Sequence, residues 1–466
     1  MDVSDYRTEK DSLGDVKVPN SALWGAQTQR SKRNFQISSR RLPDVFIRAL
    51  VEIKRACAIS NNELGIIAED VANAIVKAAD EVLDRGMHLE HFPLDVYQTG
   101  SGTQTNMNAN EVLSNRAIQI MDGTIGSKSP VHPNDHVNKG QSSNDVIPTA
   151  MHLSALAEIN KTLIPSLNKL IGALSVKMIE FKAIVKIGRT HFQDAVPLTL
   201  GQEFSGYVSQ LTSARTHLMN SVELLEFLAI GGTAVGTGLN AHPDLASKVC
   251  NILSSRYDLK LKSDANKFSL IATKDSLVAV SGALKTLAVS LMKIANDIRL
   301  LASGPRAGLG ELLLPENEPG SSIMPGKINP TQCEMLTQVV AQVIGNDATV
   351  TIGGLGSFME LNVMKPVIIS NILESIEILS NGMRSFTDHA VVGLKANEER
   401  INELVEKSLM LVTALTSQLG YDKAAKLAKQ AYVEGKTIRE VVLENNLMTE
   451  DDLNQALDLS KMVTNK

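Results

Sequence analysis

The stretch LVAVSGALKTLAVSLMKIANDIRLL, residues 277–301, decides the fold expected for this chain. Its apolar residues recur in alternating steps of three and four, at Leu277, Val280, Leu284, Leu287, Leu291, Ile294, Ile298 and Leu301. This heptad-like spacing predicts one long amphipathic helix, capped at its start by Asp275 or Ser276. Gly304 and Pro305 are expected to end it. At ~1.5 Å per residue, the rod would need packing partners over about 40 Å.

A second apolar stripe of nearly the same period runs from Leu156 to Phe181, with Pro165 as an expected kink. Further helical stretches are predicted at about 203–229, 331–350 and 363–385. Aromatic residues make up only 4% of the chain, while residues that favour helices abound. We therefore expect an all-α fold built around a central bundle of long helices.

The 466 residues predict two or three domains. The boundaries that we expect are a helical N-terminal domain at 1–142, the long-helix bundle at 143–396 and a small helical C-terminal domain at 397–466. Thr437 with Glu440, and Thr449 with Asp452, match the capping box, so each pair predicts the start of a short helix in the last domain.

Charge and composition exclude several classes of protein. A net charge of -5 offers no basic surface for nucleic acid. Cys57, Cys250 and Cys333 lie far apart without a CxxC spacing, so neither a disulfide framework nor a zinc knuckle is expected. The polar N-terminus is unlike a signal peptide, and no uninterrupted apolar run approaches ~18 residues. These features predict a cytosolic protein without a membrane segment.

Four segments are rich in Gly, Ser, Thr, Asn and His: 99–110 (TGSGTQTNMNAN), 132–145 (HPNDHVNKGQSSND), 188–194 (GRTHFQD) and 320–330 (GSSIMPGKINP). Hydroxyls, amides and glycine N–H groups can hold carboxylate oxygens without a metal. Each segment alone would be interpreted as an ordinary turn, but long helices can carry four such loops to one point.

The segment 320–330 joins a flexible Gly-Ser-Ser to the cation Lys327 and the amide Asn329. A mobile serine can close over a bound acid while the cation and the amide stabilise charge on its carboxylate. His191 is a candidate acid or base if a carboxylate such as Glu334 tunes it, although a lone histidine is more often structural.

Two other patterns are interpreted as structural. The run GGTAVGTG at 231–238 follows a helical pattern and lacks the GK[ST] ending of a phosphate loop. The pair His88 and His91 has no further ligands nearby, which argues against a zinc site.

The segment GSSIMPGKINP resembles the signature of the fumarase/aspartase superfamily. The segments TGSGTQTNMNANE, VHPNDHVNKGQSSND, GRTHFQDAVPLT and PENEPGSS are similar to class II fumarases in particular, over nearly the whole chain. Aspartases usually have Ala in place of Gly326 and depart from SGTQ at 101–104. The resemblance therefore favours a fumarate hydratase over its alternative, an aspartate ammonia-lyase, and over a lyase fold kept only for a structural role.

The resemblance implies specific roles. His191, Ser321, Lys327 and Glu334 would be catalytic, and substrate carboxylates would meet Ser101, Gly102, Thr103, Ser142, Ser143, Asn144, Thr190, Ser322 and Asn329. A secondary anion site would lie at His132, Pro133, Asn134 and Asp135, although Ser129 and Pro130 replace the basic pair that many members carry before it. The family also implies a homotetramer that shares its active sites, fumarate and malate as substrates, and no cofactor or metal.

The chemistry expected is removal of a weakly acidic proton beside a carboxylate, through an aci-carboxylate carbanion that the protein must stabilise electrostatically. Ser321 is expected to remove this proton and His191 to protonate the departing hydroxyl, although which of the two is the base stays open.

Overall fold

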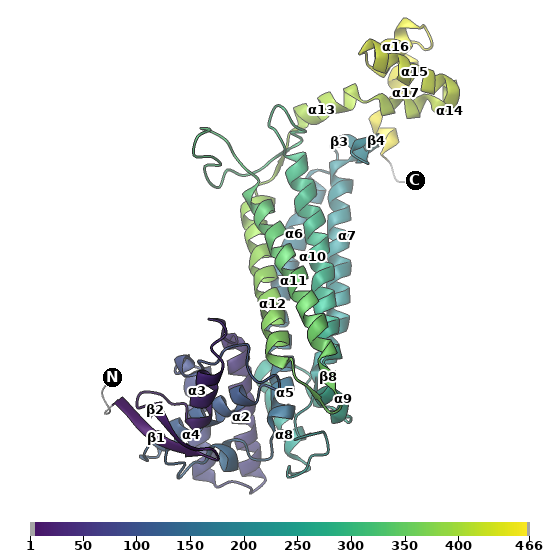
Figure 1. Ribbon diagram of the computed structural model, residues 1–466. Helices are drawn as coiled ribbons and strands as arrows, with labels where there is room; N and C mark the ends of the chain where they lie inside the picture. Colours follow the sequence, from purple (N-terminus) through teal and green to yellow (C-terminus); the bar gives the residue numbers. More distant parts are fainter. Residues whose placement is uncertain (1–4, 464–466) are drawn as a thin grey trace. The chain divides into compact units, whose positions relative to one another are not determined.

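The computed structural model describes residues 5–463, so the first four residues of the polar N-terminal stretch lie outside it, as do residues 464–466. The described chain is mostly helical, and its strands form five two-stranded sheets (Figure 1). This confirms the all-α expectation, although the hairpins were not predicted. The chain divides into two compact units, each assembled from three separate segments.

Unit 1 comprises the chain up to Ile164, Thr216–Thr286 and Ala341–Leu379. Its elements are β1 (Tyr6–Asp11), β2 (Gly14–Pro19), α1 (Ala26–Asn34), α2 (Asp44–Glu63), α3 (Glu69–Leu83), α4 (Thr103–Ile120), α5 (Ser143–Glu158), β5 (Phe227–Leu228), α8 (Leu245–Tyr257), β6 (Lys262–Ser263), α9 (Lys267–Ala272), β8 (Ser357–Phe358) and β9 (Leu361–Asn362).

Unit 2 comprises Pro165–Arg215, Leu287–Val340 and the chain from Ser380 onward. Its elements are α6 (Ile164–Glu180), β3 (Val185–Thr190), β4 (Gln193–Thr199), β7 (Leu312–Leu313), β10 (Lys395–Ala396), α13 (Glu398–Lys407), α14 (Thr416–Leu419), α15 (Tyr421–Glu434), α16 (Ile438–Glu444), α17 (Glu450–Ala456) and α18 (Leu459–Met462).

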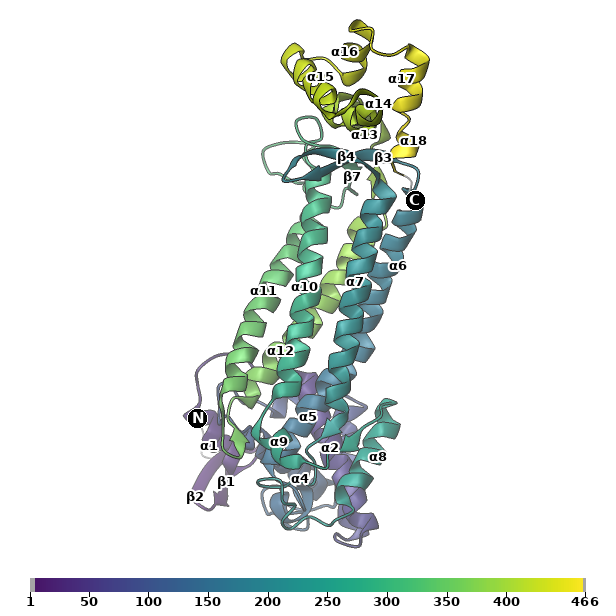
Figure 2. The same cartoon turned by 90° about the vertical axis from the view of Figure 1, so that its right-hand side faces the viewer.

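Four long helices contribute residues to both units: α7 (Leu200–Val222), α10 (Asp275–Leu301), α11 (Thr331–Leu355) and α12 (Lys365–Phe386). Within each unit their segments lie side by side (Figure 2). In unit 1, Ser281 on α10 donates a 2.8 Å hydrogen bond to Asp347 on α11. In unit 2, Tyr207 on α7 donates a 3.1 Å hydrogen bond to Asp297 on α10. The predicted long helices are therefore confirmed.

Helix α10 has the predicted apolar stripe, and all eight heptad positions are 4% exposed or less. Its length and hydropathy alone would also suit a membrane span, but such a buried stripe is typical of a core helix. The expected cap was wrong, because the helix already includes Asp275 and Ser276. The Ser276 hydroxyl instead lies 2.8 Å from the buried imidazole of His152. Gly304, with φ at +128°, follows the helix end as expected.

The stripe from Leu156 to Met178 is also helical, and Phe181 follows the end of α6; all these positions are buried apart from the partly exposed Met178. A kink was expected at Pro165, and a five-residue π-helical segment, Ile159–Leu163, ends two residues before that proline. A π segment shifts the hydrogen-bond pattern by one residue, which lets helix continue past a proline that lacks an N–H.

The C-terminal helices share a hydrophobic core of their own, which also includes Ile187 from β3. Thr437 and Glu440 form the predicted capping box at the start of α16. Thr449 likewise caps α17 by accepting the N–H of Asp452. This separate core supports a small C-terminal domain, while the boundaries 1–142, 143–396 and 397–466 stay a prediction.

Candidate active site

In unit 1, two of the predicted segments come together at the starts of helices α4 and α5. The Thr103 Oγ1, at the first residue of α4, lies 2.7 Å from the Ser101 Oγ and 2.8 Å from the Ser143 Oγ. Gly102, with φ at +76°, makes the turn into α4. Two helix N-termini and a cluster of hydroxyls thus converge, which favours binding of an anion such as a carboxylate.

The start of α5 is fixed by a capping box that the sequence analysis missed. Ser142 accepts the N–H of Asn144, and the buried Asp145 carboxylate accepts the N–H of Ser142. The same carboxylate accepts N–H groups from Gly231 and Thr233 at 3.0 and 2.9 Å. The glycine run 231–238 therefore supports the site's backbone, in line with its structural interpretation. The spacing of Ser142 and Asp145 was the available signal.

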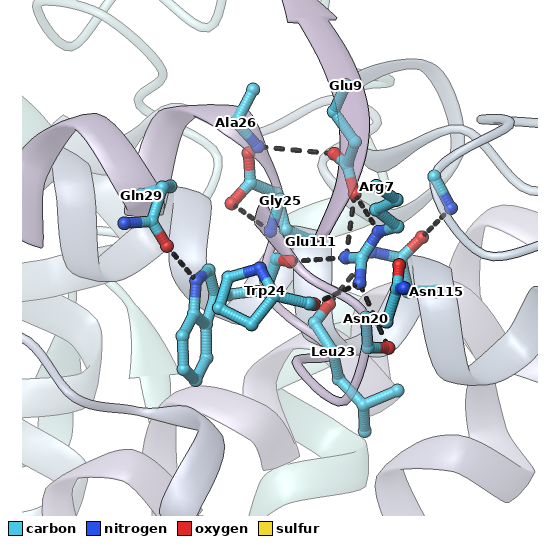
Figure 3. Close-up of polar contacts among 12 residues, drawn as sticks. Arg7, Glu9, Asn20, Leu23, Trp24, Gly25, Ala26, Gln29, Glu111 and Asn115 are labelled. Atoms are coloured by element: carbon cyan, nitrogen blue, oxygen red, sulfur yellow. Dashed lines mark hydrogen bonds and ion pairs between the residues drawn. The ribbon is translucent and has the colours of Figure 1, made fainter. Parts of the chain in front are cut away.

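Helix α4 is anchored near its middle by the buried carboxylate of Glu111 (Figure 3). Glu111 accepts the N–H groups of Gly25, Gln27 and Thr28 at the N-terminus of α1. Burial raises the pKa of Glu111. Nearby, Arg7 binds Glu9 and the carbonyl oxygen of Trp24. These contacts tie the N-terminal hairpin and α1 to the helix that presents Thr103.

Among the buried lysines of unit 1, Lys54 and Lys365 contact the predicted segments and were also missed, because a lysine within a helical pattern gives no signal of burial. Lys54 donates to Asn138 and Gln141, whereas the Lys365 ammonium has no hydrogen-bond partner among residues 5–463. The Lys365 backbone N–H donates to the Gly100 carbonyl, next to Ser101. Burial lowers the pKa of both lysines to about 7 and raises that of Asp145 to about 6.

The predicted secondary anion site lies on a π-helical segment, Pro133–Val137. The His132 Nδ1 accepts the N–H groups of Asn134 and Asp135, both at 3.1 Å. An oxygen of the Asp135 carboxylate lies 3.3 Å from the same nitrogen. Only Nε2 of His132 is left to meet an anion, and the nearby carboxylate opposes one.

In unit 2, His191 lies at the tip of the β3–β4 hairpin. Thr190 pairs with Gln193, so His191 and Phe192 form a two-residue loop, and their φ angles are +58° and +59°. Such loops favour Asn-Gly, because side chains like His and Phe are strained at positive φ by ~1–2 kcal/mol. Strain of this kind is characteristic of functional sites. Thr190 and His191 are both exposed.

The serine loop, residues 320–330, runs without helix or strand to the start of α11. The Ser321 Oγ accepts N–H groups from Ile323 and Met324 at 3.2 and 3.0 Å. Two donors directed at one oxygen favour its negatively charged form. Asn329 closes the loop by donating to the Gly320 carbonyl at 2.6 Å.

The predicted site residues of unit 2 are not all in contact with one another within residues 5–463. Ser322, Lys327 and Glu334 are exposed, and no hydrogen bond or ion pair links His191 to Glu334 or to Ser321 within residues 5–463. The pairing of His191 with Glu334 stays a prediction.

The statement that His88 and His91 lack further ligands was wrong. Ligand atoms of these two histidines and of Glu90 all lie within 4.8 Å of one another. The His88 Nε2, however, lies 2.9 Å from Glu81, whose carboxylate is held by Arg116. Contact with Glu81 therefore already occupies one of the histidines.

Comparison with known proteins gives a consistent result. Residues 14–345 match the lyase family, and residues 411–464 match the fumarase C C-terminus. A class II fumarate hydratase of Nitrosomonas europaea is 55% identical over 98% of this chain and 99% of its own length. Human mitochondrial fumarate hydratase is 55% identical over 97% of this chain and 88% of its own. A crystal structure of class II fumarase from Schistosoma mansoni has a TM-score of 0.95 at 47% identity, covering 98% of this chain and 99% of that one.

The strained turn makes a prediction about stability. Replacing His191 by Asn together with Phe192 by Gly should raise the free energy of unfolding by about 1 kcal/mol, because Asn-Gly accepts positive φ at both residues. Thermal unfolding checks this, with Phe192→Leu, which keeps the strain, as the control. A melting temperature below that of the wild type would contradict the account of the turn.

Lys365 makes a prediction about pH. In the unfolded chain its pKa returns to about 10.4, so between about pH 7 and 10 the unfolded state binds more protons than the folded state. Stability due to this group is therefore lost as the pH falls from about 10 to 7. Lys365→Met should raise the melting temperature at pH 7. The free energy of unfolding should rise there by up to a few kcal/mol, at ~1.4 kcal/mol per pKa unit, and by much less at pH 10.

The exposed Lys260 supplies the control for this measurement, since Lys260→Met should change stability little at either pH. A Lys365→Met effect that is the same at pH 7 and pH 10 would show that the buried amine does not carry this proton linkage.

Proposed function

The chain belongs to the class II fumarate hydratase family and is an enzyme that adds water reversibly to fumarate, and we propose that the residues described above carry this reaction. The observation that carries the proposal is the convergence of hydroxyls at two helix N-termini in unit 1. These hydroxyls can bind the carboxylates of a dicarboxylate, and the serine loop of unit 2 carries the groups that we assign to stabilising the charge that develops in the reaction. The aspartate ammonia-lyase alternative is set aside by the relatives.

The substrate carboxylates are bound by Ser101, Gly102, Thr103, Ser142, Ser143, Asn144, Thr190, Ser322, Lys327 and Asn329. Hydroxyl and amide donors suit carboxylate oxygens, and the N-termini of α4 and α5 add partial positive charge. Lys327 adds a full positive charge, and its exposure leaves it accessible to a ligand. The sites of His132, Pro133, Asn134 and Asp135 remain a candidate for a second, weaker anion.

In the dehydration direction, Ser321 takes the proton from the carbon beside the carboxylate, and the electron pair moves into that carboxylate to give the aci-carboxylate. The two N–H donors on Ser321 support this role because they stabilise an alkoxide. Lys327 and Asn329 stabilise the carbanion, with each donor worth ~3 kcal/mol. The C–O bond then breaks, and His191, oriented by Glu334, protonates the departing hydroxyl to water.

Substitution of the acid and the base tests these roles. Ser321→Ala and His191→Asn should each lower kcat by ~10²- to 10⁴-fold, since each removes a proton-transfer group. The absorbance of the conjugated double bond reports turnover of fumarate and malate, and aspartate serves as the non-substrate. A chelator is present throughout, because no metal is expected to take part.

Matched controls are available in the same chain. His217 is an exposed histidine on α7, and Ser385 lies on α12, outside the serine loop itself, where it donates to Gln332. His217→Asn and Ser385→Ala should keep kcat within a few-fold. If Ser321→Ala and His191→Asn behave like these controls, the assigned roles are wrong.

We also propose that the chain is a homotetramer whose active sites combine residues from several copies. Large apolar side chains are exposed on the long helices of the single chain, including Val176 and Ile179 on α6, Val289 on α10, and Ile352 and Leu355 on α11. Exposed apolar residues in this number indicate an interface. Contact between copies would let residues of different copies share one active site.

Analytical ultracentrifugation tests the assembly. The wild type should sediment as a tetramer of the 50.3 kDa chain. Val289→Glu, which places a charge in the proposed interface, should give smaller species and lower turnover in parallel. A fully active 50.3 kDa monomer would contradict shared active sites.

We propose a cytosolic location, with the reaction serving the tricarboxylic acid cycle. Cys57, Cys250 and Cys333 are buried and unpaired, and burial raises the pKa of each thiol to about 12. Thiols in this state react slowly and suit a reducing compartment. The relatives include both bacterial and mitochondrial proteins.

A further inference from the structure

A buried charge network lies beneath the β3 strand in unit 2. The Glu311 side chain is fully buried, and its Oε1 lies 2.6 Å from an Arg189 guanidinium nitrogen. The Lys186 ammonium lies 3.1 Å from the other oxygen, close enough for an ion pair but not aligned as a hydrogen bond. The backbone of Glu311 is also fixed, since its N–H donates to Leu301 and its carbonyl accepts from Asn397.

The network continues into the long helices. Lys186 is bound by Glu203 on α7 at 2.7 Å. Glu203 accepts a long hydrogen bond from Tyr207, which also donates to Asp297 on α10. One end of β3 is thereby tied to two packed helices. Glu311 is the only described member of this network that binds both cations of the strand.

Both cations lie on β3, and Arg189 is two residues before His191. The hairpin is irregular between them, because its register shifts between Ile187 and Arg189. A Cβ at Gly188 would lie 2.7 Å from the Val196 carbonyl oxygen, so the strands approach closely there. With a shifted register and a strained turn, local propensity does not fix the hairpin tip. The Arg189–Glu311 contact is positioned to do so.

We propose that Glu311 is a positioning residue for His191, acting through Arg189. Its buried carboxylate holds Arg189, which sets the place of Thr190 and His191 in the turn. The proposal rests on the role of His191 in the proposed function. Displacement of a catalytic group by about 1 Å can lower turnover by ~10²-fold, so loss of this anchor should reduce kcat.

The competing interpretation is that the network only stabilises the fold. Buried ion pairs are a weak source of stability, and removing one partner leaves an uncompensated charge. A purely structural role therefore predicts a loss of stability without a specific loss of turnover. Glu203 provides the matched comparison, because it binds the same Lys186, and no hydrogen bond or ion pair joins it to Arg189 in the described part of the chain.

The experiment compares Glu311→Gln with Glu203→Gln in the full-length protein. Both should lower the melting temperature. Glu311→Gln should also lower kcat at least 10-fold while the KM for fumarate and malate changes less than threefold. Glu203→Gln should leave both constants within threefold. Equal losses of kcat in the two variants, or a KM effect alone, would overturn the proposal.

A double-mutant cycle tests whether Glu311 acts through Arg189. Arg189→Gln should reproduce the kcat loss, and Glu311→Gln should add less than twofold in that background. Arg189→Lys, which keeps a cation, should recover part of the turnover. If the fold losses of kcat in the two single variants multiply in the double variant, the two residues act separately. Since Arg189 is partly exposed, Arg189→Gln also tests the proposal if Glu311→Gln fails to fold.

His191→Asn separates failure of this proposal from failure of the proposed function. If His191→Asn retains turnover, the assignment of His191 is wrong, and Glu311 has no catalytic residue to position. If His191→Asn loses turnover while Glu311→Gln and Arg189→Gln keep it, only the positioning role is wrong.

Discussion

Burial of a continuous apolar stripe along long helices is the constraint on which the rest of this structure depends. A helix such as α10, whose heptad positions are all buried, can be stable only where other helices cover it along its length. Such packed helices are rigid, so the segments that begin or end at them are held in defined places. The serine loop leads directly into α11, and Glu311 follows shortly after α10.

The polar groups of the site are placed by this framework at some cost to stability. Lys54, Lys365 and Asp145 are buried in unit 1, and burial displaces the pKa of each towards the neutral form. The Lys365 ammonium has no hydrogen-bond partner among the described residues. The backbone N–H of Lys365 nevertheless donates to the Gly100 carbonyl oxygen, next to the hydroxyl of Ser101, so this buried lysine lies on a segment that contacts the hydroxyl cluster.

Unit 2 also contains features that cost stability in the single chain. His191 and Phe192 occupy a turn that Asn-Gly would fill with less strain, and the serine loop exposes Ile323 to solvent. Neither choice is explained by folding of the single chain. Both are understandable if the hairpin tip presents an imidazole and the loop closes over a ligand or against another copy. The ion pairs of Glu311 would then compensate for the weak local preference of the hairpin.

The sequence by itself determined the long helices, the helical end domain with its capping boxes, and the family, since these follow from periodicity and from contiguous motifs. It also identified the hydroxyls of Ser101, Thr103 and Ser143, because small polar residues in an apolar chain are conspicuous. Only the tertiary structure decided that these hydroxyls meet at two helix N-termini. It also decided that Lys365 is buried, that His191 lies in a strained turn, and that Glu311 faces Arg189. Such features depend on contacts between residues distant in sequence, and no local pattern encodes them.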